Sequence, residues 1–174
     1  DLAEFLTDRL KYYMKAKGIR IDIMNASINS FGINQITKIY KKSLTLNKLI
    51  KKEIGTNIIS SYKRAFNILE NELKNTELEL SINTDPALFK NDYEKKLYKK
   101  IYELRKYFGS INKDEDYKLT LDNLANSKQV IFDFFENVKI NDEDKTIQKN
   151  RLELLQMLCK TFDNYINFST IESV

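Results

Sequence analysis

The sequence contains no histidine and only one cysteine, Cys159, among its 174 residues. Histidine is the usual general base near neutral pH and the commonest metal ligand, and a single thiol cannot complete a zinc site. These absences exclude Ser-His-Asp and Cys-His catalysis, zinc sites and histidine-containing di-iron centres within this chain. A lone cysteine cannot form an internal disulfide either, so nothing indicates an oxidising compartment and we expect the protein in the cytoplasm.

Chain-breaking residues and long hydrophobic runs are scarce as well. The chain has four Gly and one Pro, with 42% hydrophobic and 31% charged residues, which is typical of a folded protein with long helices. No apolar run approaches the roughly 18 residues needed to span a bilayer, so we expect no membrane association. The acidic start Asp1-Leu2-Ala3-Glu4 is unlike a signal peptide. Because it starts with Asp1 rather than Met, within a helical pattern, we expect the chain to be part of a longer protein.

Apolar residues recur every three or four positions along most of the chain, which predicts an all-α bundle of seven or eight helices. The predicted helices cover about residues 2–17, 22–31, 34–54, 56–74, 93–108, 117–138 with a bend near Ser127, and 144–165. We expect Asp22, Asn34 and Asp85 to act as helix caps, and Gly18 and Gly55 to end helices. The polar segment 75–84 is predicted to be the one long loop of a single domain spanning residues 1–174.

Basic residues are concentrated in the first part of the chain. Residues 1–76 contain 14 Lys or Arg and 7 Asp or Glu, a net charge of +7, whereas residues 77–174 contain 15 and 18, a net charge of −3. At about 100° per residue, five lysines of the predicted helix 34–54 fall within an arc of roughly 120° opposite its apolar side. This lysine face consists of Lys38, Lys41, Lys42, Lys48 and Lys52, and Lys63 and Arg64 follow on the next helix.

Two interpretations of the lysine face stay open. One is a phosphate-binding stripe for nucleic acid, with an affinity that falls steeply as salt rises. The other is an ordinary solvated face, because 24 of the 29 basic residues are Lys, as an adenine- and thymine-rich genome would encode. Charge alone favours the solvated face, which is the commoner fate of a charge run.

Several other features suggest chemistry but have simpler explanations. The four glycines stand apart, so no glycine-rich loop holds a nucleotide phosphate. The clusters 114–116 and 142–144 are acidic but lack the glycine and glutamate of a calcium loop, and we expect them to cap helices. We expect Cys159 to be a buried small hydrophobe, and Phe132, Phe134 and Phe135 to be core residues rather than stacking platforms. We therefore predict no catalytic residue, metal site or cofactor site in this chain.

Five motifs occur in order along nearly the whole chain. They are Phe5-Leu6, Arg9-Leu10 and Gly18-Ile19-Arg20 with Asp22; Tyr62-Lys63-Arg64-Ala65-Phe66-Asn67-Ile68-Leu69; Asp85-Pro86-Ala87-Leu88-Phe89; Phe134-Phe135-Glu136-Asn137-Val138; and Asn150-Arg151-Leu152-Glu153-Leu154-Leu155. In this combination the sequence resembles the C-terminal anticodon-binding domain of the bacterial glycyl-tRNA synthetase β subunit.

The resemblance implies an all-helical anticodon-binding module of the type named after Asp-Ala-Leu-Arg. The corresponding stretch of this chain, 144–148, lacks the arginine, so no base-reading role is assigned to Gln148. The family enzyme is a heterotetramer of two α and two β subunits that uses ATP with Mg²⁺ to attach glycine to its tRNA, with its catalytic centre in the α subunit. The resemblance therefore implies substrate selection without catalysis.

Glycine anticodons end in two cytosines, and proteins read RNA mainly at such single-stranded loops. The resemblance favours the phosphate-binding interpretation of the lysine face. The predicted RNA contacts are Lys38, Lys41, Lys42, Lys48, Lys52, Lys63 and Arg64 for the backbone, with Asn67, Asn150 and Arg151 nearer the bases. For Asn67 and Arg151, a buried brace between helices is an equal alternative. The rival function is a helical domain that binds the α subunit without reading RNA.

Overall fold

The computed structural model describes residues 2–75, 79–81, 83–110 and 116–172. Within these ranges the chain is all-α, as predicted, and it contains no strand. The eight α-helices are α1 (Leu2–Ala16), α2 (Ile21–Phe31), α3 (Ile36–Leu49), α4 (Glu53–Asn75), α5 (Asp92–Ser110), α6 (Tyr117–Ala125), α7 (Lys128–Asn137) and α8 (Lys145–Asp163). Single 3₁₀ turns occur at η1 (Ile33–Gln35), η2 (Pro86–Leu88) and η3 (Phe168–Thr170).

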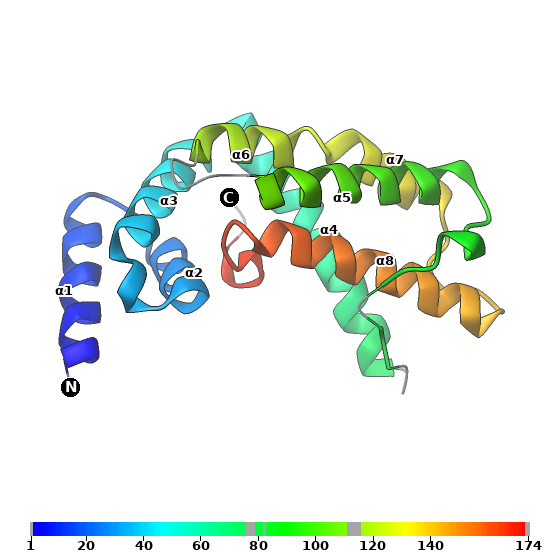
Figure 1. Cartoon of the computed structure of the whole chain (residues 1–174), viewed down its shortest axis with the longest axis horizontal. Coiled ribbons are helices and arrows are strands. Elements are labelled where there is room, and N and C mark those ends of the chain that lie inside the picture. The colour runs from blue at the N-terminus through cyan, green and yellow to red at the C-terminus, as the bar shows by residue number, and fades with distance from the viewer. Residues whose placement is uncertain (1, 76–78, 82, 111–115, 173–174) are drawn as a thin grey trace.

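The helices form an elongated bundle around α4. α4 packs against α8, α6, α7 and α3, and α5 packs against both α7 and α8. Figure 1 shows α1 at one end of the molecule, next to α2 and α3, while α5 and α8 run alongside each other at the other end. None of the described helices combines the length and the apolar character needed to cross a membrane.

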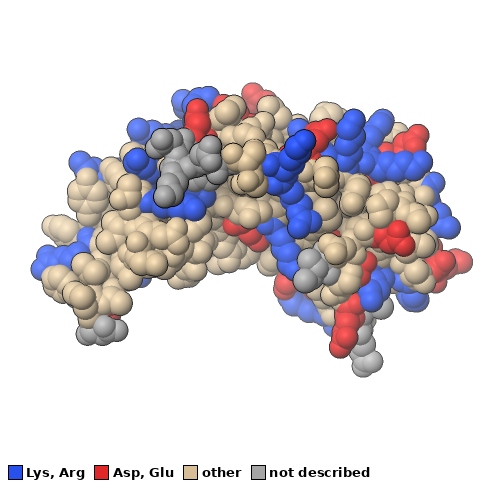
Figure 2. Space-filling view, viewed as in Figure 1, with Lys and Arg blue, Asp and Glu red and all other residues tan. Residues whose placement is uncertain are grey.

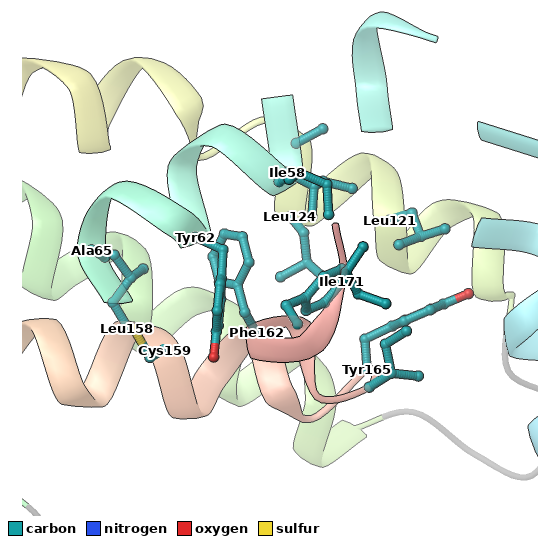
Figure 3. Close-up of a cluster of buried hydrophobic side chains, with 14 of the residues drawn as sticks. Ile58, Tyr62, Ala65, Leu121, Leu124, Leu158, Cys159, Phe162, Tyr165 and Ile171 are labelled. Atoms are coloured by element: carbon teal, nitrogen blue, oxygen red, sulfur yellow. The ribbon is translucent and has the colours of Figure 1, made fainter. Parts of the chain in front are cut away.

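All eight described helices contribute buried side chains to the core, and one part of it is formed by α4, α6, α8 and the segment that follows α8. The ring of Tyr62 in α4 stacks on Phe66 and contacts Phe162 and Phe168. Its centroid lies 5.6 to 6.1 Å from the centroids of these three rings. Figure 3 shows these helices converging on one cluster of side chains that includes Tyr62 and Phe162. Cys159 lies in the same cluster and is buried, as predicted, and burial raises the pKa of its thiol to about 12. A thiol with this pKa stays protonated and unreactive at neutral pH.

Several predicted helix ends are confirmed. Gly18 follows α1 with a positive φ of 71°, a conformation that favours glycine. Asp116 and Asp144 cap α6 and α8, because their side chains accept hydrogen bonds from the backbone N–H groups of Leu119 and Thr146. Residues 114 and 115 of the first acidic cluster lie outside the described residues. The described residues between α4 and η2 form no helix, in agreement with the predicted loop at 75–84.

The boundary between α3 and α4 differs from the prediction. α3 ends at Leu49, and Gly55 lies within the first turns of α4 instead of ending the preceding helix. A Cβ atom at position 55 would lie 2.3 Å from Ile50 Cα and 2.5 Å from the carbonyl oxygen of Leu49. Glycine is therefore required by the close approach of two helix ends, which helical periodicity does not reveal.

The predicted caps Asp22, Asn34 and Asp85 do not cap the α-helices expected to follow them. Asn34 lies inside η1, and the N-cap of α3 is Gln35, whose side chain forms no capping hydrogen bond. Asp22 lies inside α2, whose N-cap is Arg20, and its carboxylate accepts hydrogen bonds from Arg20 and from the backbone N–H of Glu172. It therefore links α2 to the C-terminal segment. Asp85 caps only the 3₁₀ turn η2, and the side chain of Asn91 accepts hydrogen bonds from the first N–H groups of α5 instead.

Candidate nucleic-acid interface

The lysine face remains exposed at three of its five members. Lys41 and Lys48 project from α3, Lys52 lies in the turn that leads into α4, and all three side chains are exposed. Lys38 is half-buried, because its ammonium lies 4.9 Å from the ring centroid of Phe31. These four cations lie on or just after one helix and are available for contact with an anionic partner.

Lys42 does not belong to this exposed group, and the expectation that it contacts RNA is wrong. Its side chain is buried, and its Nζ donates hydrogen bonds to the carbonyl oxygens of Tyr165 and Asn164 at 3.1 and 3.3 Å. It also lies 4.7 Å from the ring centroid of Phe31. Lys42 is at the edge of the predicted arc, next to the buried Ile39, and the segment after α8 covers that edge.

The two cations predicted on α4 have partners within the fold. Lys63 is half-buried and its Nζ donates a hydrogen bond to the carbonyl oxygen of Ser169 at 2.8 Å. Arg64 is exposed, forms an ion pair with Glu136 of α7 at 3.0 Å and lies 4.7 Å from the ring centroid of Phe135. Because both side chains have partners within the fold, neither extends the exposed lysine face onto α4. Asn67 is exposed, so the alternative of a buried brace is wrong for this residue.

Asn150 and Arg151, predicted nearer the bases, are buried structural residues. The Asn150 side chain accepts a hydrogen bond from the backbone N–H of Asp85 and donates one to its carbonyl oxygen, at 2.8 and 3.0 Å. Arg151 is 6% exposed and binds Glu94 at 2.7 Å and Asp142 at 2.6 Å. Hydrogen bonds from the Asp144 backbone and from Arg151 lower the pKa of Asp142. Direct base contact by Asn150 or Arg151 is therefore excluded in this conformation, because their polar groups are already engaged.

Gln148 has a similar structural role. Its side chain is buried, donates a hydrogen bond to Glu72 of α4 at 3.1 Å and accepts one from Lys145 at 2.9 Å. The residue at this position therefore links α8 to α4. Of the three phenylalanines expected in the core, Phe134 is buried and Phe135 half-buried, but Phe132 is 49% exposed.

α5 carries a basic and aromatic surface that the sequence analysis missed. Six basic and three acidic residues occur in this helix, and one acid, Glu94, is buried against Arg151. At 100° per residue, four of the basic residues and two tyrosines share an arc of roughly 120°, and the exposed Lys96 and Glu103 lie just beyond it. We call this set the α5 stripe, and it consists of Lys95, Tyr98, Lys99, Tyr102, Arg105 and Lys106.

The α5 stripe is accessible over most of its length. Tyr102 is 60% exposed, and Lys99, Arg105 and Lys106 are also exposed. Lysine and arginine side chains lie along the part of the surface formed by α5 (Figure 2). Aromatic rings interleaved with cations are the usual composition of a surface that binds single-stranded nucleic acid. The spacing of 95, 99, 102 and 106 was available in the sequence, but the net negative charge of residues 77–174 concealed it.

An all-helical fold with an exposed basic and aromatic helix defines a candidate nucleic-acid-binding protein. The chain matches the family described as the DALR anticodon binding domain over residues 58–174. It therefore belongs to the DALR anticodon binding domain family, which confirms the resemblance inferred from the motifs. The matched range begins within α4 and includes the α5 stripe, whereas α3 precedes it.

Relatives of one name align with nearly the whole chain. The Glycine--tRNA ligase beta subunit of Cereibacter sphaeroides is 29% identical over 172 residues, which is 99% of this chain and 25% of that protein. The proteins of the same name from Rickettsia typhi and Paracoccus denitrificans are 33% and 29% identical, over 94% and 99% of this chain. The chain spans about a quarter of the length of these relatives.

Proposed function

We propose that the chain is the tRNA anticodon-binding module of a glycine–tRNA ligase β subunit. The observation that carries this proposal is the family match over residues 58–174, within a chain that aligns to glycine–tRNA ligase β subunits over 99% of its length. The exposed α5 stripe supports it, because cations hold RNA phosphates while aromatic rings stack on unpaired bases. The catalytic centre of the holoenzyme would then lie outside this chain.

The contacts divide into two kinds. Lys38, Lys41, Lys48 and Lys52 would hold the tRNA backbone, which positions the RNA but does not identify its sequence. The α5 stripe would meet the unpaired anticodon bases. The two cytosines of glycine anticodons each offer an amino group, for which a backbone carbonyl or a carboxylate is a suitable acceptor.

Titration of the chain with glycine tRNA tests this function. A matched RNA has only its two anticodon cytosines replaced, and both RNAs are measured at two salt concentrations. We expect the natural tRNA to bind more tightly at both. Equal, salt-sensitive binding of the two RNAs would reduce the role to backbone contact, and absence of binding to either would remove the proposal.

The remaining properties of the holoenzyme follow from the same proposal. We infer that the chain works in the cytoplasm within an assembly of two α and two β subunits. That assembly would use ATP with Mg²⁺ at the α subunit to attach glycine to its tRNA. No group of three or more potential metal-ligating side chains lies together in the described part of this chain.

One observation favours a second function, a protein-interaction domain that binds the α subunit. α1 exposes an apolar face at the end of the molecule, with Leu2 72%, Phe5 55% and Tyr13 48% exposed. Exposed apolar patches of this kind often mark protein interfaces. Phe5→Ser should weaken holoenzyme assembly in gel filtration and leave tRNA binding by the chain unchanged. Normal assembly by this variant would exclude α1 as the α-subunit contact.

A further inference from the structure

A cavity of about 450 Å³ opens beside the α5 stripe. Its volume falls within the roughly 300–1,000 Å³ range of ligand sites in proteins. Six of its lining residues carry polar or aromatic groups: Asn83, Thr84, Tyr98, Tyr102, Arg105 and Lys106. Met157 of α8 also lines it and, together with Arg105, lines a second cavity of about 200 Å³. The two cavities share these residues, so they form parts of one hollow between α5 and α8.

Thr84, one of the residues that line this cavity, has a hydroxyl without a hydrogen-bond partner in the described part of the chain. Thr84 is 6% exposed, and its Oγ1 is buried without a hydrogen bond. Buried side-chain hydroxyls are almost always hydrogen-bonded, and a group bound in the cavity could supply the partner that the Thr84 hydroxyl lacks. A hydroxyl both donates and accepts, and it can therefore bond either kind of atom on a ligand.

The other lining residues define the chemistry of that group. Tyr98 is held against Phe89, with ring centroids 5.5 Å apart, and Tyr102 presents a largely exposed ring at the cavity. Arg105 and Lys106 add two cations. None of the described residues lining either cavity is acidic, although Lys160 adds a further cation to the smaller one. The hollow therefore suits an anion that carries a flat ring, which is the chemistry of a nucleotide.

We propose that this cavity binds one unpaired nucleotide of the tRNA. The base stacks on Tyr102, the Thr84 hydroxyl bonds to the edge of the base, and Arg105 and Lys106 hold the adjoining phosphates. The remaining cations of the α5 stripe extend this site along the RNA for about 16 Å, the rise between residues 95 and 106. This inference rests on the proposed tRNA-binding function and assigns it a particular pocket.

The test uses glycine tRNA with 2-aminopurine at one anticodon-loop position at a time, because stacking quenches the fluorescence of this base. At one position, binding of the unmodified chain should quench the signal. Tyr102→Ala should abolish that quenching and weaken binding about 5- to 100-fold, the usual range for loss of one base–aromatic contact. Tyr12→Ala is the matched control, because Tyr12 is 74% exposed on α1 and lies outside the cavity.

Thr84→Val separates a ligand contact from a structural role. Valine keeps the size of threonine and removes a hydroxyl that has no described partner, so thermal stability should not fall. Affinity for the tRNA should nevertheless fall about 2- to 10-fold, as expected for loss of one hydrogen bond. Unchanged affinity in both Thr84→Val and Tyr102→Ala would overturn the pocket.

The outcomes distinguish the pocket from the function on which it rests. If the unmodified chain discriminates glycine tRNA from the cytosine-substituted RNA while both variants bind normally, the pocket is wrong and the function stands. If the chain does not discriminate but Tyr102→Ala still abolishes quenching, the pocket is a nucleotide site and the anticodon-reading function is wrong.

Discussion

α3 and α5 both carry closely spaced lysines, but their cations have different surroundings. In α3, Lys42 is buried and bonded to backbone carbonyls, so its charge is used inside the fold, while the half-buried Lys38 lies over the ring of Phe31. In α5, Lys99 and Lys106 reach solvent beside the exposed Tyr102. α5 also lies within the range matched by the family, and α3 does not. Charge density alone therefore does not locate an interface, whereas the partners of each cation do.

The largest effect should come from Arg151, a buried cation of α8 that pairs with Glu94 of α5. Arg151→Ala removes the ion-pair partner of Glu94, which is fully buried, and should cost about 3–5 kcal/mol of unfolding free energy. Urea denaturation measures this loss. Lys160→Ala on the same helix is the control, because Lys160 is exposed and should change stability by no more than about 0.5 kcal/mol. Similar stabilities of the two variants would show that Arg151 is not a brace.

A neighbouring pair in α3 gives the next largest effect. Lys42→Met keeps a long unbranched side chain but removes the ammonium that donates hydrogen bonds to the carbonyl oxygens of Tyr165 and Asn164. It should cost about 1–3 kcal/mol of stability and, in the folded protein, leave tRNA affinity unchanged. Lys41 is the preceding residue and is exposed, so Lys41→Met should leave stability unchanged and weaken tRNA binding. Thermal melting and tRNA titration of both variants would show whether burial separates their roles.

The two regions can then be compared directly by their salt dependence. Lys99→Gln with Lys106→Gln should reduce the slope of log affinity against log salt by about 1.4, or roughly 0.7 per lost contact with a single strand. Lys41→Gln with Lys48→Gln should produce a smaller reduction, because α3 lies outside the matched family range. An equal or larger change from the α3 pair would reverse the comparison.

The smallest effect concerns acid stability of the link between α2 and the C-terminal segment. Burial raises the pKa of Asp22, but hydrogen bonds from Arg20 and from the backbone of Glu172 and Ile23 outweigh it and lower the pKa overall. Because the folded pKa is below the unfolded value, this stabilisation is present above about pH 4 and is lost as pH falls further. Asp22→Asn should therefore lose less stability than the unmodified protein between pH 6 and 3. Urea denaturation at pH 6 and pH 3 measures the loss for both proteins, and an identical loss of unfolding free energy would contradict the prediction.

Local patterns predicted most helices because each depends on residues close in sequence. The apolar repeat of α4, the glycine after α1 and the cap at Asp144 all act within one or two turns. The predicted boundary at Gly55 was wrong because the relevant contact joins the ends of two helices. Steric contact between helix ends leaves no periodic signal in either helix.

The candidate site was harder to predict, because a helical projection shows which residues share a side but not what covers that side. Asn150 and Arg151 belong to a family motif, yet they brace η2 and α5. The α5 stripe had a regular spacing that could have been found with a window limited to one helix. The unsatisfied Thr84 hydroxyl could not be predicted from the sequence, because its surroundings depend on how a non-helical segment packs against the helices.

Composition, short motifs and short-range periodicity are properties of the chain alone, and they were enough to predict the all-α class and the family. Which cations are available to a partner depends instead on how distant segments pack. Lys41 and Lys42 are adjacent and chemically identical, but one is exposed and the other is bonded to carbonyl oxygens 122 and 123 residues away in sequence. Long-range packing sets the solvation of each charge, and solvation decides whether that charge can bind RNA.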